Sequence, residues 1–445
     1  MPQQPNILLI ISDQWSTRIA DGSGTAPYCI RTSAVDQLAR EGIRFTQSYA
    51  TFPLCNPNRS TMFTGLYPHH HRMTDNEEVF MDKYGKMPTR TDIATMGAVF
   101  KRAGYNTAYF GKEHAGNYGW DSIDEFGTFR YSGGGMLAEG SCYDPVFTRD
   151  AVNYLNHYDS DDPFYMVVSL INPHDICKVL GGKVQGATIA DAIFFCRTDD
   201  ELYLRYQQRP DLPPNFDAPA IDGMIRHNDY MYEELQQWTV DEWKRYVASY
   251  GLMVENTDWN IQLVLNALQQ AGLEEDTIVI FTTDHGEMLS SHRLISKINF
   301  YEESAKTMMI VKQPNVIEAG AVNQDAFIGT IDLMPTMIDL CDIDVPDGLD
   351  GKSFKYACYG DSDTGFDEVY GVNHDGRMLR WGSYKYVRSK VYGDDYHILF
   401  DLVRDPDETT NVYSDPNYHD VATLATEKMD NWLSEQGIKV AYDPI

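Results

Sequence analysis

The sequence predicts an α/β protein in which a large mixed, mostly parallel sheet is sandwiched by helices, with a smaller α+β domain after it. Over about the first 340 residues, short apolar runs alternate with segments of helical periodicity, which is typical of parallel strands joined by helices. Beyond about residue 351 the pattern changes to short strands, turns and one helix. The chain of 445 residues also exceeds the ~100–200 residues of a usual domain. We therefore predict a first domain over residues 1–350 and a second over residues 351–445.

Four apolar runs are the candidate strands of the large sheet. In chain order they are Ile7–Ile11, Thr107–Phe110, Phe164–Ile171 and Thr277–Thr283. Helix-like segments lie between them, among them Ser33–Glu41 and Leu252–Ala271. The stretch from about Lys178 to Trp238 contains Gly-Gly, several prolines and many polar residues, so we expect long loops with short helices there.

Turn signals and short apolar runs predict the smaller domain. Arg377–Arg380 and Tyr384–Arg388 flank Trp381-Gly382-Ser383, which is typical of a hairpin. His397–Leu402 is a further candidate strand, and His419–Gln436 has the apolar spacing of a packed helix.

The composition excludes some classes of partner. With 43% hydrophobic and 23% charged residues the chain is typical of globular proteins. Its net charge of −30 argues against nucleic acid or an anionic membrane, because binding phosphates needs a basic face. No apolar run reaches the ~18 residues of a membrane-spanning helix. The first residues lack a basic leader and a long apolar signal region, so we expect a cytoplasmic protein, although a trimmed periplasmic or secreted protein would look the same.

Cys55 is the one cysteine whose surroundings suggest chemistry. The seven cysteines are an odd number without a repeating spacing, which predicts neither a disulfide framework nor a zinc site. Pro57 fits the first turn of a predicted helix, so Cys55 lies just before the helix N-terminus, where negative charge and an activated thiol are favoured. Arg59, four residues on, faces the same side. A buried cysteine beside a surface arginine is an equally good interpretation of this segment alone.

Polar side chains capable of chemistry follow each of the four predicted strands. Ligands of open α/β sheets bind beyond the carboxyl ends of the strands. A single aspartate after a strand is more often a helix cap or a turn residue. Four such coincidences favour a shared site instead. The residues that would converge there are Asp13, Gln14, Lys112, His114, His174, Asp284 and His285.

The segment Cys55-x-Pro57-x-Arg59, followed by Ser-Thr-Met-Phe-Thr-Gly, resembles the signature of the type I sulfatases in the alkaline phosphatase superfamily. Other segments resemble the family's landmarks in the same order along nearly the whole chain. They are Pro5 to Gln14, Gly111-Lys112-x-His114, Pro173-His174-Asp175, Thr283-Asp284-His285-Gly286-Glu287, Lys297, Tyr301–Ser304, Asp332–Thr336, Tyr384–Tyr386 and Asp405-Pro406-x-Glu408. The ordered set is a strong signal. It implies an alkaline-phosphatase-like fold and a hydrolase of sulfuric esters.

The resemblance further implies that a maturase oxidises Cys55 to formylglycine (3-oxoalanine). One hydroxyl of the hydrated aldehyde would attack sulfur, and loss of the proton from the other would expel sulfate. Asp13, Gln14, Asp284 and His285 would hold a divalent cation together with residue 55. The resemblance implies four further catalytic roles. Arg59 would steady the hydrate, and Lys112 and Lys297 would bind sulfate oxygens. His114 would be the base that completes turnover, and His174 would assist the leaving group.

Three positions depart from the commonest pattern of the family. Gln14 stands where a second acidic residue is usual, Asn58 where a small residue is usual, and His285 where asparagine is frequent. Oxygen ligands favour Ca²⁺, which is the expected cation. The nitrogen of His285 would shift the preference toward Mn²⁺ or another transition metal.

Two other functions stay open at this point. Phosphonate monoester hydrolases and related phosphodiesterases resemble sulfatases, but their pattern lacks Lys112 and His114, which favours sulfate esters here. A non-catalytic anion-binding relative is the alternative from another class. The expected substrate is an anionic sulfate ester, either a sulfated carbohydrate or a small organic sulfate. Four residues are candidate substrate contacts: Asn76, Glu78, His292 and His374. For each of them, a structural role is the favoured interpretation.

Overall fold

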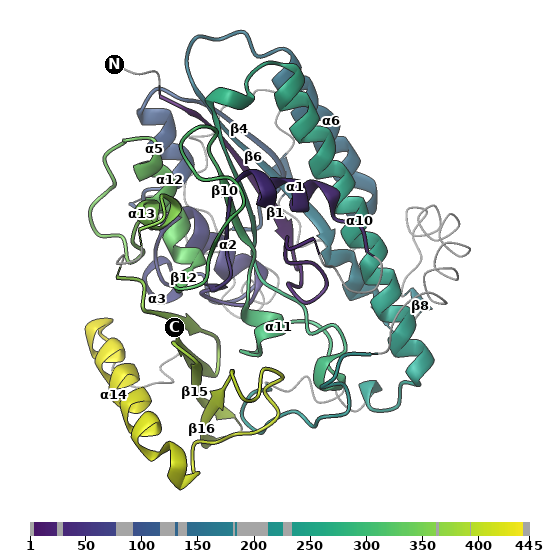
Figure 1. The fold of residues 1–445 in the computed structure, drawn as a ribbon, viewed down its shortest axis with the longest axis vertical. Coiled ribbons are helices and arrows are strands. Elements are labelled where there is room, and N and C mark those ends of the chain that lie inside the picture. Colours follow the sequence, from purple (N-terminus) through teal and green to yellow (C-terminus); the bar gives the residue numbers. More distant parts are fainter. Residues whose placement is uncertain are drawn as a thin grey trace.

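A large mixed sheet with helices on both faces forms the upper part of the molecule, and a small antiparallel sheet with one helix forms the lower part (Figure 1). This arrangement confirms the predicted fold class. The computed structural model describes residues 4–24, 30–76, 92–115, 130–131, 140–180, 183–184, 212–225, 234–361, 365–391 and 393–438.

Four parallel neighbours form the centre of the large sheet. Within the described residues its strands are β1 (Asn6–Asp13), β2 (Ile43–Phe45), β4 (Asn106–Lys112), β5 (Arg130–Tyr131), β6 (Phe164–Pro173), β9 (Thr277–Thr283), β10 (Met309–Lys312) and β11 (Ala321–Asn323). The order β4-β6-β1-β9 is parallel throughout. Beyond it, β10 pairs antiparallel with β9. The four predicted apolar runs are therefore confirmed as adjacent strands, and their carboxyl ends meet at one edge.

Helices cover both faces of the sheet because the strand side chains are apolar on both sides. Along β1, Leu8 and Ile10 pack into one core, whereas Ile7, Leu9 and Ile11 pack into the other. The helices of the first core are α1 (Ser33–Glu41), α6 (Gly140–Asn156) and α10 (Val240–Gln270). Those of the second are α2 (Cys55–Thr64), α5 (Met96–Arg102), α12 (Leu333–Leu340) and α13 (Lys355–Cys358).

Helix α10 is longer than the predicted helix over Leu252–Ala271. It begins at Val240, behind a capping box in which Thr239 and Glu242 bond each other's backbone N–H groups. Its first turns bury large aromatic side chains such as Trp243 and Tyr246. The aliphatic periodicity therefore identified only the second half of the helix.

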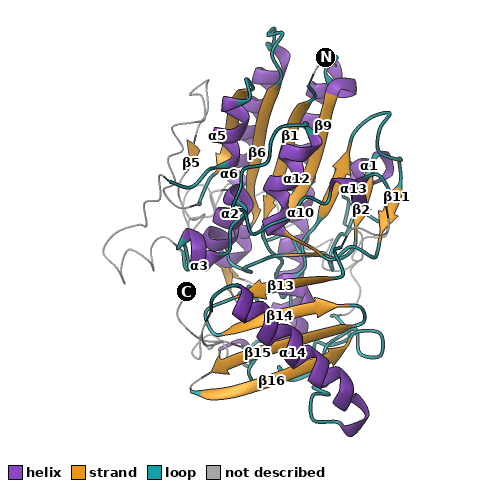
Figure 2. Cartoon of the chain, turned by 90° about the vertical axis from the view of Figure 1, so that its left-hand side faces the viewer, coloured by secondary structure: helices purple, strands orange, loops and turns teal. Residues whose placement is uncertain are grey.

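The small sheet is antiparallel and carries α14 (His419–Glu435) across one face (Figure 2). Its strands, in spatial order, are β13 (Glu368–Val372), β14 (Gly376–Trp381), β15 (Tyr384–Val391) and β16 (Asp394–Asp401). The predicted hairpin is confirmed as β14 and β15. Residues before position 351, such as Phe52 and Tyr301, belong to the cores on the two faces of this sheet. The domain boundary at residues 350 and 351 stays a prediction.

Short elements connect the layers. They are β3 (Ser48–Tyr49), α3 (Pro68–His71), β7 (Val179–Leu180), β8 (Lys183–Val184), α11 (Glu302–Ala305), β12 (Ile328–Gly329), and 3-10 turns at His174–Lys178, Glu274–Asp276, Ser291–Arg293, Thr330–Asp332 and Pro416–Tyr418. Much of the predicted loop segment, including residues 185–211, lies outside the described residues. Among the helices that the structure describes, none combines the length and the apolar character needed to cross a membrane.

Asp258 of α10 caps the N-terminus of α1 from outside the helix. Its Oδ1 accepts hydrogen bonds from the backbone N–H groups of Ala34 at 3.1 Å and Val35 at 3.0 Å. Burial raises the pKa of Asp258 to about 6. We predict that Asp258→Ala lowers the free energy of unfolding by about 1–2 kcal/mol in urea titrations near pH 8, where the carboxyl is ionised. Asp258→Asn keeps an acceptor oxygen and should lose less; equal losses in the two variants would contradict the capping role.

Candidate active site

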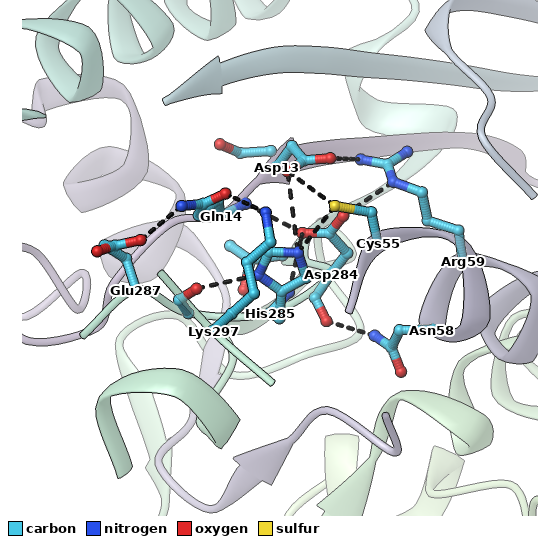
Figure 3. Close-up of polar contacts among 12 residues, drawn as sticks. Asp13, Gln14, Cys55, Asn58, Arg59, Asp284, His285, Glu287 and Lys297 are labelled. Carbon is cyan, nitrogen blue, oxygen red and sulfur yellow. Dashed lines mark hydrogen bonds and ion pairs between the residues drawn. The ribbon is translucent and has the colours of Figure 1, made fainter. Parts of the chain in front are cut away.

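The carboxyl ends of the four central strands lie near the N-terminal part of α2. In Figure 3, Asp13, Cys55 and Asp284 lie close together. Asp13 is the last residue of β1 and Lys112 the last of β4, while His174 and Asp284 directly follow β6 and β9. Cys55 is the first residue of α2, one position inside the helix rather than just before it as expected. None of these five residues is more than 3% exposed. The structure thus brings the predicted residues together at one buried edge of the sheet.

Glycine at position 111 lets β4 approach β6 closely enough to deliver Lys112. Gly111 has a φ of +112°, and a Cβ there would lie 1.9 Å from the backbone oxygen of Ser169. No other residue type fits both constraints without displacing a strand.

Four side chains form a cluster able to hold a metal ion. They are Asp13, Cys55, Asp284 and His285, whose ligand atoms all lie within 4.8 Å of one another. Sγ of Cys55 lies 3.2 Å from Nε2 of His285 and 3.8 Å from Oδ1 of Asp13. Nδ1 of His285 donates to the backbone oxygen of Gly286 at 3.0 Å, which leaves Nε2 for a ligand. Two carboxylates, an imidazole nitrogen and residue 55 fit a divalent cation.

Gln14, the fifth predicted ligand, is fully buried beside this cluster. Its backbone N–H donates to Oδ1 of Asp284 at 3.0 Å. Its side-chain oxygen accepts from Nζ of Lys297, and its side-chain nitrogen donates to Glu287 (Figure 3).

Arg59 connects the carboxylates of Asp13 and Asp284. Its Nε donates to Oδ2 of Asp284 at 2.9 Å and its Nη2 to Oδ2 of Asp13 at 3.2 Å. Its Nη1 donates to the backbone oxygen of Lys112 at 3.0 Å and to Oγ of Ser169 at 2.8 Å. The guanidinium is fully buried and joins the ends of β1 and β4, the middle of β6 and the segment after β9. It thereby fixes the orientation of both carboxylates.

The contacts of Asn58 explain why this residue stands where a small one is commonest in the family. Its side-chain nitrogen donates to the backbone oxygen of Asp284, and its oxygen accepts from Oγ1 of Thr330 at 2.7 Å. A small residue at this position would lack this link between α2 and the segment after β9.

Buried cations set the charge of the cluster. Burial alone would raise the pKa of Asp13, but Lys112, whose Nζ lies 2.6 Å from Oδ2, leads the cations that hold this pKa well below its usual value. Burial and Asp13 would also raise the pKa of Cys55, yet Lys112 and Lys297 contribute to a net lowering below that of a free thiol. Residue 55 therefore lies where an anion is stabilised.

Two histidines present ring nitrogens that no described residue engages. Both ring nitrogens of His114, and Nδ1 of His174, are buried without a hydrogen-bond partner among the described residues. Burial and the nearby Lys112 ammonium lower the pKa of both histidines well below the usual value. Both are therefore neutral near pH 7.

The candidate substrate contacts fall in different places. Asn76 accepts a hydrogen bond from the backbone N–H of Asn56 at 3.3 Å, next to Cys55. His374 stacks edge-on against Phe52. The remaining two are His292, which is buried and stacked on Tyr301, and Glu78, which lies outside the described residues.

Sequence reasoning assigned no role to three residues that contact the site. Ser169 holds Arg59 from within β6, Glu287 holds Gln14, and Cys177 lies with its Sγ 3.5 Å from the side-chain oxygen of Gln14. Glu287 was visible as part of the segment after β9. Ser169 and Cys177 carried no signal, because each contact joins segments that are far apart in the sequence.

Comparison with known proteins identifies the family. The sulfatase family model matches residues 5–343, which is most of the chain. The chain belongs to the sulfatase family. The predicted membership of the type I sulfatases and the predicted enzyme class, a sulfuric ester hydrolase, are thereby confirmed. A further model, described as the C-terminal part of N-sulphoglucosamine sulphohydrolase, matches residues 290–435.

Individual relatives agree with this family. A Δ4,5-hexuronate-2-O-sulfatase of Bacteroides thetaiotaomicron is 26% identical in an alignment that covers 99% of this chain and 92% of the relative. A solved structure described as a complex with its substrate D-glucosamine-2-N,6-O-disulfate has a TM-score of 0.79 at 20% identity and covers 99% of this chain and 100% of the other. The phosphonate monoester hydrolase of Agrobacterium radiobacter has a TM-score of 0.75 at 21% identity, with 97% and 96% covered. These two structures support the alkaline-phosphatase-like fold.

We predict that Arg59→Ala lowers the free energy of unfolding of this sulfatase by about 3–5 kcal/mol, because two buried carboxylates lose their shared partner. Arg59→Lys keeps the charge but not the forked donors, so it should lose less. Denaturant titration of the three proteins measures the effect. A loss under about 1 kcal/mol for Arg59→Ala would show that the carboxylates do not depend on Arg59.

Proposed function

We propose that this sulfatase removes sulfate from a sulfated carbohydrate, with residue 55 acting as formylglycine and with a divalent cation bound beside it. The observation that carries the proposal is the buried cluster of Asp13, Cys55, Asp284 and His285 within 4.8 Å. Lys112 and Lys297 supply positive charge around it. Ligands for a cation, a nucleophile position and cations for an anionic ester thus occur together.

The donor atoms support a hard cation. Asp13 and Asp284 supply carboxylate oxygens, Gln14 offers an amide oxygen, and His285 offers one nitrogen. This mainly oxygen set fits Ca²⁺, with Mn²⁺ as the alternative that the nitrogen favours. When bound, such a cation acts as a Lewis acid and lowers the pKa of the nucleophile.

The setting of Cys55 supports its conversion to formylglycine, which supplies a hydrated aldehyde as nucleophile. The cations that lower the pKa of the Cys55 thiol would equally stabilise an oxygen anion there. Cys55 is 0% exposed, and every residue of α2 is buried. A maturase would therefore have to reach Cys55 before the chain has folded.

The remaining side chains divide between binding and proton movement. Lys112 and Lys297 would bind ester oxygens through their ammonium groups. Neutral His114 is in the protonation state that a base needs. A neutral His174 is better suited to donate a hydrogen bond from its ring N–H to the leaving oxygen than to transfer a proton outright.

A short sulfated saccharide is the substrate class that we favour over a small organic sulfate. The relatives described above include an enzyme named for a 2-O-sulfated hexuronate and a complex with a sulfated glucosamine. A net charge of −30 repels long polyanionic chains, whereas a mono- or disaccharide carries few charges. Phosphonate ester hydrolysis is the second candidate, and Lys112 and His114 at the end of β4 favour the sulfate ester over it.

We expect released sulfate from a panel of sulfated mono- and disaccharides, assayed beside an aryl sulfate and a phosphonate monoester. Cys55→Ala should lower kcat/KM at least ~10³-fold because the nucleophile is lost. The mass of the peptide containing residue 55 should show an aldehyde in place of the thiol. A large preference for the phosphonate would overturn the sulfatase assignment. Only unmodified cysteine, from a host with the maturase, would instead favour a non-catalytic anion-binding role.

His174→Ala should reveal a leaving-group role. We expect about a 100-fold lower kcat for a saccharide sulfate, whose alkoxide leaves poorly, and a much smaller loss for an aryl sulfate with a good leaving group. His114→Ala is the matched control, and its loss should not depend on the leaving group. Equal losses for both esters in His174→Ala would contradict this role.

A further inference from the structure

Glu287 is a buried carboxylate to which the mechanism above assigns no role. It is 0% exposed and follows the cation ligands Asp284 and His285 by only a few residues. It lies on the side of Gln14 away from Lys297 (Figure 3). Its placement therefore raises the question of what it does for Gln14.

Among the described residues, each hydrogen-bond partner of Glu287 is a donor. Oε2 accepts from the side-chain nitrogen of Gln14 at 2.5 Å. Oε1 accepts from the hydroxyl of Tyr246 at 2.8 Å and from the backbone N–H groups of Ser296 at 2.6 Å and Leu289 at 3.3 Å. The carboxylate is thus anchored by three groups on one oxygen and presents the other oxygen to Gln14.

The opposite end of the Gln14 amide meets donors. Its oxygen accepts from Nζ of Lys297 and lies 3.5 Å from Sγ of Cys177. An amide has a donor end and an acceptor end of nearly the same shape, so only its neighbours decide its orientation. Reversal would place an NH₂ group against the Lys297 ammonium and an oxygen against the Glu287 carboxylate. Both contacts would be repulsive.

We propose that Glu287 is a positioning residue that locks the amide of Gln14 with its oxygen toward Lys297 and the cation cluster. A carboxylate at position 14, the commonest choice in the family, needs no such lock because both of its ends are oxygens. Glutamine can replace it as a ligand only where a fixed acceptor holds the nitrogen away from the cation. The inference rests on the proposed cation site.

The sharpest test exchanges the two groups. In Glu287→Gln the three donors at Oε1 keep the remaining oxygen, so an NH₂ group replaces the acceptor that faces Gln14. The double variant Gln14→Glu with Glu287→Gln restores an amide–carboxylate pair with the polarity reversed. In the double variant either oxygen of position 14 can face the cation. Titration calorimetry with Ca²⁺, repeated with Mn²⁺, measures the dissociation constant of each purified full-length protein. Melting temperatures without added cation report on folding.

We expect Glu287→Gln to weaken Ca²⁺ binding roughly 10–100-fold, the usual effect of losing a residue that orients a ligand. The exchanged pair should recover most of that affinity. Tyr246→Phe, which removes one anchor but keeps the carboxylate, should change the affinity little. If the exchanged pair fails to fold, Gln14→Ala decides: with no amide to orient, adding Glu287→Gln should weaken binding no further.

Three results with the variants would overturn the inference. The first is an unchanged affinity for Ca²⁺ in Glu287→Gln. The second is an exchanged pair that folds but binds Ca²⁺ as weakly as Glu287→Gln does. The third is that Glu287→Gln weakens binding in the Gln14→Ala background as much as it does in the wild-type protein. A wild-type protein that binds neither cation would also end it. These experiments measure cation binding and not turnover. If cation binding depends on Glu287 but the protein releases no sulfate in the separate activity assay, this inference is upheld and the proposed function is wrong.

Discussion

The paired interaction of buried Arg59 with Asp13 and Asp284 is the contact on which the rest of the site depends. The two carboxylates terminate or follow adjacent strands and point at the same small volume, where alone they would repel each other. One oxygen of each is bonded to the guanidinium, which leaves the other facing the cluster. Because Arg59 extends from α2, the same contact fixes the helix that begins at Cys55. The orientation of both carboxylates and the position of residue 55 are therefore set together.

The charges at this edge balance before any cation is added. Asp13, Asp284 and Glu287 oppose Arg59, Lys112 and Lys297, all of them buried or partly buried. A divalent cation would make the local charge positive in a chain whose net charge is −30. This excess suits an anionic ester and an oxygen anion at residue 55. A strongly acidic protein can bind a sulfate ester in this way, because the electrostatic field that acts on the ester comes mainly from the nearest buried charged groups.

The sequence predicted the strands and the residues at their ends because both follow from local pattern. Apolar runs bounded by polar groups identify buried parallel strands, and the rule for sheet edges places Asp13 beside Asp284. Pro57 indicated the helix that positions Cys55. The bonding of Gln14 to Glu287 was not predictable, since it joins segments about 270 residues apart and leaves no periodic signal. The early turns of α10 were missed because their buried face is aromatic.

The site that these contacts assemble is best tested by locating the cation directly. Crystals of the protein soaked in Mn²⁺ give an anomalous difference map in which the ion is visible by itself. We expect one strong peak bonded to Asp13, Asp284, His285 and residue 55 at about 2.0–2.5 Å. A well-ordered structure whose strongest protein-bound peak lies elsewhere, with no density between these side chains, would contradict it.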